Sequence, residues 1–334
     1  MDGSFAPGSA VAIHLRSPAT MRELLSSDMR QDSSATLAER PVLPPARAGL
    51  GWGLLGVTAF SFTVPFTRVA VGAMSPLFIG CGRAVVAALL AAVALACTRQ
   101  RLPRGVQWFR LAIVAAGVVV GFPVLTSFAL TTASASHSAV VIALLPAATA
   151  VIAVLRGRER PAARFWVAAA LGAVAAVAFA SLQGGFTGPR WSDLLLVGAV
   201  LAAGIGYAEG GLLARELGAW QTISWALVLS APLMTALAAV AAWQHPPTGT
   251  AVDWAAFAYL GVVSMFLGFF AWYRGLAIGP MARVSQIQLV QPVLTICWAV
   301  LFLGEAITWP TVLGGLAVIA CAGLAVRTRL IRRA

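Results

Sequence analysis

The chain has 334 residues, of which 60% are hydrophobic and only 10% are charged, and its mean hydropathy is +0.88. Soluble domains carry about 25% charged residues, so this composition excludes a soluble protein and indicates one that crosses a membrane several times. The formal net charge is +12, and all 23 basic residues are arginine. These arginines stand at the edges of apolar runs, where they set membrane topology, so nucleic acid is not expected as a partner.

Residues 1–47 differ from the rest of the chain because they mix Ser, Pro and charged residues without a sustained apolar run. This composition predicts a disordered cytoplasmic tail. The segment also lacks the apolar core of a cleavable secretory signal. An alternative start at Met21 or Met29 would shorten it. At the other end, the arginine-rich residues 327–334 predict a basic cytoplasmic C-terminus.

From Gly49 onward, apolar runs alternate with short polar breaks. A membrane-spanning helix needs about 20 apolar residues, and Arg47 and Arg68 enclose twenty uncharged residues, one span's worth. The uncharged stretch 111–155 is long enough for two spans, and the polar residues 131–137 divide it. The pattern predicts an all-α integral membrane protein with ten transmembrane helices, at 49–68, 74–97, 108–130, 135–155, 164–183, 192–214, 220–243, 254–276, 282–303 and 308–326.

The arginines also predict the orientation of these spans. With the N-terminus inside, 20 of the 23 arginines fall on the inner side of the membrane, as the positive-inside rule requires. An even number of spans places both termini on that same side. We therefore expect a multi-pass protein with both termini cytoplasmic, and the lysine-free, Ala- and Gly-rich composition suits a bacterial inner membrane.

Two pairs of residues suggest an internal duplication. Pro146 and Pro292 are 146 residues apart, and so are Glu159 and Glu305. The predicted repeats, 48–183 and 190–326, hold five spans each, so the second copy must enter the membrane upside down. Inverted repeats with a site between them are a recurrent transporter architecture.

Three segments resemble the EamA type of the drug/metabolite transporter superfamily. They are residues 264–324, which begin SMFLGFFAWYRG, residues 127–161, which begin SFALTTASASH, and CGRAVVAALL at 81–90, similar to the family's arginine-containing second helix. The resemblance covers about residues 49–326. It implies two inverted five-helix EamA repeats, a central cavity and alternating-access movement of small metabolites, commonly outward. One departure is Arg-Gly-Arg-Glu-Arg-Pro at 156–161, where the family has an apolar residue, Gly and Glu.

Two charged residues fall inside predicted spans, where an unpaired charge is costly. Glu209 is a candidate for proton or cation coupling, or else an acid near the inner interface paired with an arginine. Arg83 is a candidate clamp for a substrate carboxylate or phosphate, although we favour an internal ion pair or carbonyl cap that locks helices. Glu209 is one conceivable partner for Arg83. An unpaired Arg83 would favour anionic or zwitterionic substrates, and a free Glu209 cationic ones.

The ninth predicted span carries Gln288, Gln291 and Thr295 on one helical face. We interpret this stripe as a wall that faces substrate, with interhelical hydrogen bonding as the alternative. Three aromatic residues of other spans, Tyr207, Trp272 and Tyr273, are candidates for stacking on substrate or for packing.

Other polar and helix-breaking residues have structural interpretations. Pro146 and Pro292 fall within spans, where each removes a backbone hydrogen bond and acts as a hinge. Glu159 and Glu305 follow spans, where each is expected to cap the next helix. His137 lies at the outer end of a span and is expected to be an interfacial histidine.

The favoured function is a secondary transporter that exports small metabolites such as amino acids. The alternative is a multidrug or xenobiotic efflux permease, and a membrane-embedded enzyme is remote because no acidic pair, HExxH or GxSxG motif appears. No phosphate-binding loop, dinucleotide fingerprint or metal-ligand cluster appears, so neither cofactor nor metal is expected. The expected partners are a small-molecule substrate and the lipid bilayer, and the oligomeric state stays open.

Overall fold

The computed structural model describes residues 46–156, 163–183, 190–278, 284 and 287–330. Most of these residues are helical and none is in a strand, as the composition predicts. Glu159 and most of the two predicted terminal segments, 1–47 and 327–334, lie outside the described residues. The α-helices are α2 (Ala46–Ser61), α3 (Thr63–Ala70), α4 (Pro76–Cys97), α5 (Val106–Val114), α6 (Phe122–Ala129), α7 (Ala135–Ile142), α8 (Leu145–Arg156), α9 (Ala163–Gln183), α10 (Trp191–Leu217), α11 (Ala219–Gln244), α12 (Ala251–Tyr259), α13 (Gly268–Ile278), α15 (Gln291–Leu303) and α16 (Trp309–Leu330).

Three shorter segments have other helical geometries. Two are π-helices, η1 (Ala115–Gly121) and η2 (Leu260–Leu267), and the third is the 3₁₀ turn η3 (Gln288–Val290). Each π-helix continues directly from one α-helix into the next, so α5, η1 and α6 form one rod and α12, η2 and α13 form another.

Local sequence signals explain where several helices begin. Ser75 accepts a hydrogen bond from the Phe78 N–H and precedes Pro76, whose missing N–H is not needed at a helix start. Thr250 and Asp253 form a reciprocal capping box at the start of α12. Ser134 caps α7 by accepting from the His137 N–H.

Among the described residues, seven helices are long and apolar enough to cross a membrane: 48–70, 76–97, 106–129, 135–152, 191–217, 219–244 and 251–278. Shorter apolar helices cover 288–303 and 309–321. The chain is therefore an all-helical, multi-pass membrane protein. The count of ten spans stays a prediction.

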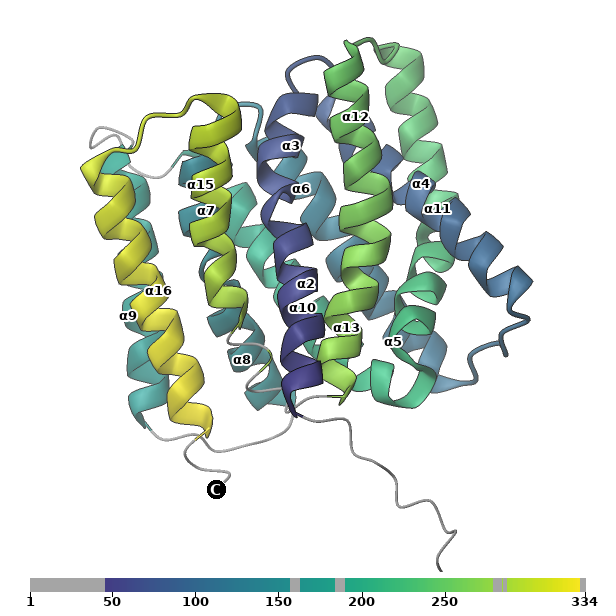
Figure 1. The fold of residues 1–334 in the computed structure, drawn as a ribbon, viewed down its shortest axis with the longest axis horizontal. Helices are drawn as coiled ribbons and strands as arrows, with labels where there is room; N and C mark the ends of the chain where they lie inside the picture. Colours follow the sequence, from purple (N-terminus) through teal and green to yellow (C-terminus); the bar gives the residue numbers. More distant parts are fainter. Residues whose placement is uncertain (1–45, 157–162, 184–189, 279–283, 285–286, 331–334) are drawn as a thin grey trace, which may run out of the picture. The chain divides into compact units, whose positions relative to one another are not determined.

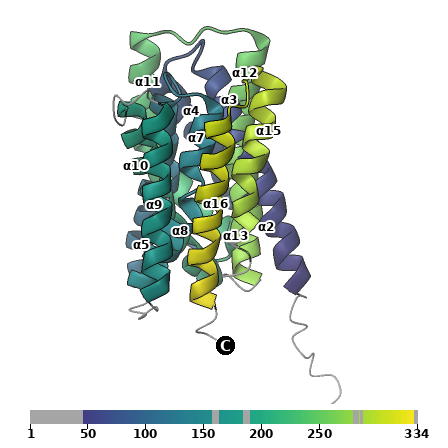
Figure 2. The same cartoon turned by 90° about the vertical axis from the view of Figure 1, so that its left-hand side faces the viewer.

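Long helices from the two halves of the chain pack together. Helix α4 packs along α11, α2 along α13, and α9 along α16, and Figures 1 and 2 show these helices running side by side. Helix α10 contacts α5, η1, α6 and α8, while α15 contacts α2 and α7. Because α10 and α15 of the second half contact helices of the first half, the space between these helices can be lined by side chains from both halves.

Candidate functional site

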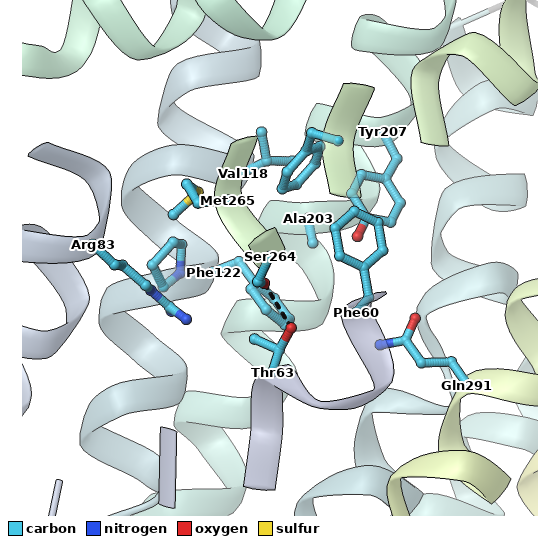
Figure 3. A pocket seen from close by; sticks show the side chains of 12 residues that line it. Phe60, Thr63, Arg83, Val118, Phe122, Ala203, Tyr207, Ser264, Met265 and Gln291 are labelled. Carbon is cyan, nitrogen blue, oxygen red and sulfur yellow. Dashed lines mark hydrogen bonds between the residues drawn. The ribbon is translucent and has the colours of Figure 1, made fainter. Parts of the chain in front are cut away.

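A narrow cavity lies between helices of both halves (Figure 3). It is lined by aromatic or apolar side chains and a few polar ones, from α2, α3, α4, η1, α6, α10, η2, α13 and α15: Phe60, Thr63, Arg83, Val118, Phe122, Pro123, Ala203, Tyr207, Ser264, Met265, Phe269 and Gln291. Its open volume is about 20 Å³, which is room for about one water molecule. The cavity in this conformation is therefore too small to hold a metabolite.

Arg83 is the charged residue of this lining, and its side chain is only 1% exposed. Its Nη1 and Nη2 donate to the hydroxyls of Thr67 and Thr126, at 3.5 and 3.3 Å, and its Nε has no hydrogen-bond partner within the described part of the chain. Among the described residues, no carboxylate forms an ion pair with it. The sequence favoured an ion pair or a carbonyl cap that locks helices. Among the described residues Arg83 instead joins α4 to α3 and α6 through two hydroxyls, and the guanidinium retains unused hydrogen-bonding capacity.

Aromatic rings form the wall of the cavity to the right of Arg83 in Figure 3. The ring of Phe60 lies 4.9 Å from that of Phe269 and 6.4 Å from that of Tyr207, measured between centroids. Tyr207 was expected as a candidate from the sequence, whereas Phe60 and Phe269 were not. Between this wall and Arg83, the hydroxyls of Thr63 and Ser264 share a hydrogen bond of 2.7 Å that joins α3 to η2.

The two π-helices both line the cavity. Val118 of η1 and Ser264 of η2 contact it, and they are 146 residues apart, the same spacing as the proline and glutamate pairs. A π-helical segment within an α-helix is rare and frequently occurs at a functional site. No sequence signal predicted these segments, because their composition is that of ordinary apolar helix.

The predicted polar stripe divides into two environments. Gln291 lines the cavity, and its Oε1 has no hydrogen-bond partner among the described residues. Gln288 is buried, and both of its amide atoms lack such a partner. Thr295 instead donates a hydrogen bond of 2.9 Å to the carbonyl of Ser61. Pro65, four residues after Ser61, lacks the N–H that would bond this carbonyl in a helix, so Thr295 has a structural partner.

Helix α15, which carries Thr295, also stabilises the helix break at Phe62. Trp298 donates its Nε1–H to the hydroxyl of Ser61 at 2.9 Å, and its ring stacks on Phe62 with centroids 4.5 Å apart. The junction of α2 and α3 is therefore held by α15. This places Phe60 and Thr63, on either side of the break, at the cavity.

The remaining aromatic candidates differ in their contacts. Trp272 is 1% exposed and packs 5.7 Å from Tyr207, and its Nε1 has no hydrogen-bond partner among the described residues. Tyr273 donates to the carbonyl of Gly206 at 3.2 Å and so connects α13 with α10. Neither residue lines the cavity directly.

Glu209 lies outside the cavity lining and is bound by Arg110 of α5. The same guanidinium also binds Glu216 of α10. Glu209 thus binds Arg110, an arginine that the sequence places only as a topology marker, and among the described residues no ion pair joins it to Arg83. Because Glu209 is 4% exposed, this pair is largely removed from solvent.

The two predicted hinge prolines both lie in the first turn of a helix. Pro146 is the second residue of α8, after the break at Ala143 and Leu144, and Pro292 is the second residue of α15, after η3. At this position the N–H that proline lacks has no helical partner in any case. Each predicted span is thus interrupted before its proline.

Glu305 caps a helix, though not the next one. Its Oε1 and Oε2 accept hydrogen bonds from the N–H groups of Ala135 and Ser136, at 2.8 and 2.9 Å. These are first-turn donors of α7, where a carboxylate is favourable. The expected target was the following helix, α16, so the structure corrects the target.

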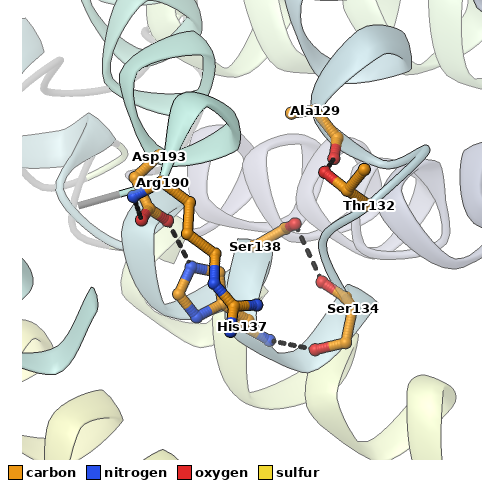
Figure 4. A network of polar contacts seen from close by, with 7 residues as sticks. All are labelled: Ala129, Thr132, Ser134, His137, Ser138, Arg190 and Asp193. Atoms are coloured by element: carbon orange, nitrogen blue, oxygen red, sulfur yellow. Dashed lines mark hydrogen bonds and ion pairs between the residues drawn. The ribbon is translucent and has the colours of Figure 1, made fainter. Parts of the chain in front are cut away.

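Polar contacts near the start of α10 tie it to α7 (Figure 4). His137 of α7 binds Asp193 through its Nε2, and Asp193 also accepts from the Arg190 N–H at 2.8 Å. His137 is therefore part of a helix-to-helix contact rather than a solvated interfacial side chain.

Comparison with known proteins agrees with this architecture. The model of the EamA-like transporter family matches residues 47–181 and again 190–327. A Bacillus subtilis (strain 168) protein named "Uncharacterized transporter YdeK" is 44% identical over 282 residues, which are 83% of this chain and 97% of that one. A protein of known crystal structure has a similar fold, with a TM-score of 0.61 and 17% identity over 86% of this chain and 98% of its own. The chain therefore belongs to the EamA-like transporter family, a family of membrane transporters.

Proposed function

We propose that this chain is a secondary transporter that exports small carboxylate-bearing metabolites, with amino acids and related compounds first among them. The observation that carries the proposal is Arg83, a buried guanidinium that lines the cavity without a carboxylate partner among the described residues. An uncompensated charge at this depth is costly. A substrate carboxylate accepted by Arg83 would offset that cost, and a guanidinium binds a carboxylate through two parallel hydrogen bonds.

The rest of the cavity supports an amphipathic substrate. The rings of Phe60, Phe269 and Tyr207 offer an apolar surface, and their faces also attract an ammonium group. Figure 3 shows the amide of Gln291 pointing into the cavity from the side opposite Arg83. A zwitterion or an acid with a second hydrogen-bonding group would engage Arg83 and Gln291 together.

The proposed architecture is ten spans in two inverted five-helix halves, 48–183 and 190–326, in a bacterial inner membrane with both termini cytoplasmic. The helix contacts support the repeat. The first helix of the first half, α2, packs on α13 of the second half, and the first helix of the second half, α10, packs on η1 and α6 of the first half. The matched π-helices support it as well. The arginine distribution supports the orientation.

The proposed mechanism is alternating access, with the closed cavity opening to one side at a time. Polar contacts near opposite ends of α10 would serve as the two closures. Glu209 and Glu216 bind Arg110 towards its C-terminal end, and Asp193 binds His137 in its first turn. The 27 residues of α10 span about 40 Å, so the two closures lie far apart. In this scheme Glu209 acts as a lock between α5 and α10, and Gln288 and Trp272 extend the polar lining when the cavity opens.

A second candidate function is efflux of amphipathic xenobiotics that carry an acidic group. The aromatic and methionine side chains of the cavity favour it, since such surfaces adapt to ligands of different shape. This candidate shares the Arg83 site and differs only in the origin of the substrate.

The test is a mass-spectrometric comparison of medium and cell extracts from cells that overexpress the wild-type chain, the Arg83→Gln variant or an empty vector. We expect wild-type cells to enrich one class of carboxylate-bearing metabolite in the medium and to deplete it inside. The variant, at an equal amount in the membrane, should resemble the empty vector. Accumulation inside the cells would reverse the proposed direction. No difference for any metabolite, followed by resistance to acidic xenobiotics, would favour the second candidate.

A further inference from the structure

A second hollow lies between residues 98–105, which connect α4 to α5, and the junction of α10 with α11. We call it the basic cleft. Its open volume is about 590 Å³, far larger than that of the central cavity. All four helices that meet there belong to candidate membrane spans. The basic cleft therefore lies where those spans end, at the level of lipid headgroups.

The basic cleft carries an excess of positive charge. Arg99, Arg101 and Arg104 line it, all three are exposed, and none of them forms an ion pair with a described residue. The acid in its lining, Glu216, is bound by Arg110. An anion that entered the basic cleft would thus meet three arginines whose charge is not neutralised within the described part of the chain.

The connecting segment presents these arginines from a defined backbone. The side chain of Gln221 donates to that of Gln100 at 3.3 Å, and the side chain of Gln107 accepts from the Arg104 N–H at 2.9 Å. These bonds tie the segment to α11 and to the start of α5. A segment whose backbone is already held in place loses less entropy when it binds a ligand.

Apolar side chains flank the arginines on the outer surface. Leu102, Val106 and Phe109 are 67%, 72% and 69% exposed, and the last two begin a candidate span. In a bilayer such side chains contact acyl chains. The combination is therefore a set of phosphate-binding groups directly beside a lipid-facing surface.

We propose that the basic cleft binds the headgroup of an anionic phospholipid, with the phosphate between Arg99, Arg101 and Arg104 and the acyl chains along α5. Guanidinium groups bind phosphate oxygens bidentately, and basic pockets between membrane helices bind anionic lipid headgroups. A free phosphate would not contact Leu102 or Val106, so these apolar side chains favour a lipid as the ligand. This proposal concerns lipid binding and is independent of what the central cavity transports.

The test is native mass spectrometry of the full-length protein in detergent, titrated with phosphatidylglycerol or phosphatidylcholine. The wild-type protein should retain phosphatidylglycerol in preference to phosphatidylcholine. The variant Arg99→Gln/Arg101→Gln/Arg104→Gln should bind phosphatidylglycerol at least about tenfold more weakly. The matched control, Arg158→Gln/Arg160→Gln/Arg164→Gln, removes the same number of charges elsewhere in the sequence and should bind like the wild type.

Three outcomes would overturn the proposal. They are an equal loss of binding in both triple variants, equal retention of the two lipids by the wild type, and displacement of phosphatidylglycerol by millimolar inorganic phosphate. If the triple variant of the basic cleft does not survive purification, the single variants Arg101→Gln and Arg104→Gln decide the same question. Each should weaken binding about threefold, and unchanged binding in both would contradict the site.

Discussion

Glu305 and Ala135 are joined by a hydrogen bond of 2.8 Å, although they are 170 residues apart in the chain. The carboxylate also accepts from Ser136 and so satisfies two N–H groups that α7 cannot pair within itself. The contact ties the start of α7 to the segment between α15 and α16. A residue of the second half of the chain thus stabilises a helix of the first half.

Replacing Glu305 by Ala should therefore destabilise the folded protein. Two buried or half-buried N–H groups would lose a charged acceptor, and hydrogen bonds to charged groups contribute about 1.5–3 kcal/mol. We expect a lower melting temperature in detergent for Glu305→Ala, and an intermediate one for Glu305→Gln, which keeps a single neutral acceptor. A melting temperature equal to the wild type's in both variants would contradict the capping role.

Thr295 provides a second stability prediction, because its hydroxyl bonds the Ser61 carbonyl that Pro65 leaves without a helical partner. Thr295→Val keeps the shape of the side chain but removes the donor, and should cost about 1 kcal/mol of unfolding free energy. Thr295→Ser keeps the donor and should cost less. The free energies of unfolding are compared by reversible unfolding in mixed micelles, with tryptophan fluorescence as the signal. Equal losses in the two variants would indicate that packing, not the hydrogen bond, is at stake.

Gly117 of η1 allows a close approach between the third predicted span and α10. A Cβ atom there would lie 2.4 Å from the carbonyl oxygen of Ala202, which belongs to backbone and cannot swing away. Gly117→Ala should therefore push α10 outward and cost about 1–3 kcal/mol. The matched control is Gly51→Ala in α2, where a Cβ meets nothing within 4 Å and helix propensity improves. Equal thermal stability of the two variants would refute this close contact.

The sequence predicted most of the described helical intervals, but not the breaks within them or the contacts between them. Span positions follow from apolar runs and their arginine boundaries, and Arg83, Tyr207 and Gln291 stand out as polar or aromatic groups within them. The partner of Glu209 could not be found this way, because Arg110 is 99 residues away and falls among the arginines that mark topology. The π-helices and the cavity residues Phe60 and Phe269 gave no signal either, since an apolar helix has the same composition whether it lines a cavity or faces lipid.

Because Glu209 is paired with Arg110, two roles of Glu209 can be tested against each other: a lock between α5 and α10, and a proton-coupling site. If Glu209 is a lock, Glu209→Gln should change the transport rate while the pH dependence keeps the wild-type shape. Arg110→Gln should destabilise the protein by about 3 kcal/mol, because it deprives two glutamates of their shared cation. Arg104→Gln removes an exposed arginine of the same region and should not. A Glu209→Gln transport profile that no longer responds to pH would contradict the lock and support coupling.

Arg83 yields the sharpest test of substrate chemistry, because its role depends on one charge. Arg83→Gln should reduce transport of a carboxylate substrate at least about tenfold, since a charge-assisted bidentate pair is lost. Transport of the same compound as its neutral amide should fall less, so the ratio of the two rates should shift toward the amide. Arg68→Gln is the matched control, because Arg68 donates to the carbonyls of Leu130 and Thr131 away from the cavity.

The ratio of the two rates is the measurement that distinguishes binding from structure. If the role of Arg83 is only structural, its replacement should lower both rates together, because loss of correctly folded protein reduces transport of the acid and of its amide alike. Arg83→Lys keeps the charge but loses the planar fork, so it should preserve the preference for the acid with a weaker apparent affinity. If the ratio of the two rates is unchanged in Arg83→Gln, with the protein folded and in the membrane, the proposal that Arg83 binds the substrate carboxylate is contradicted.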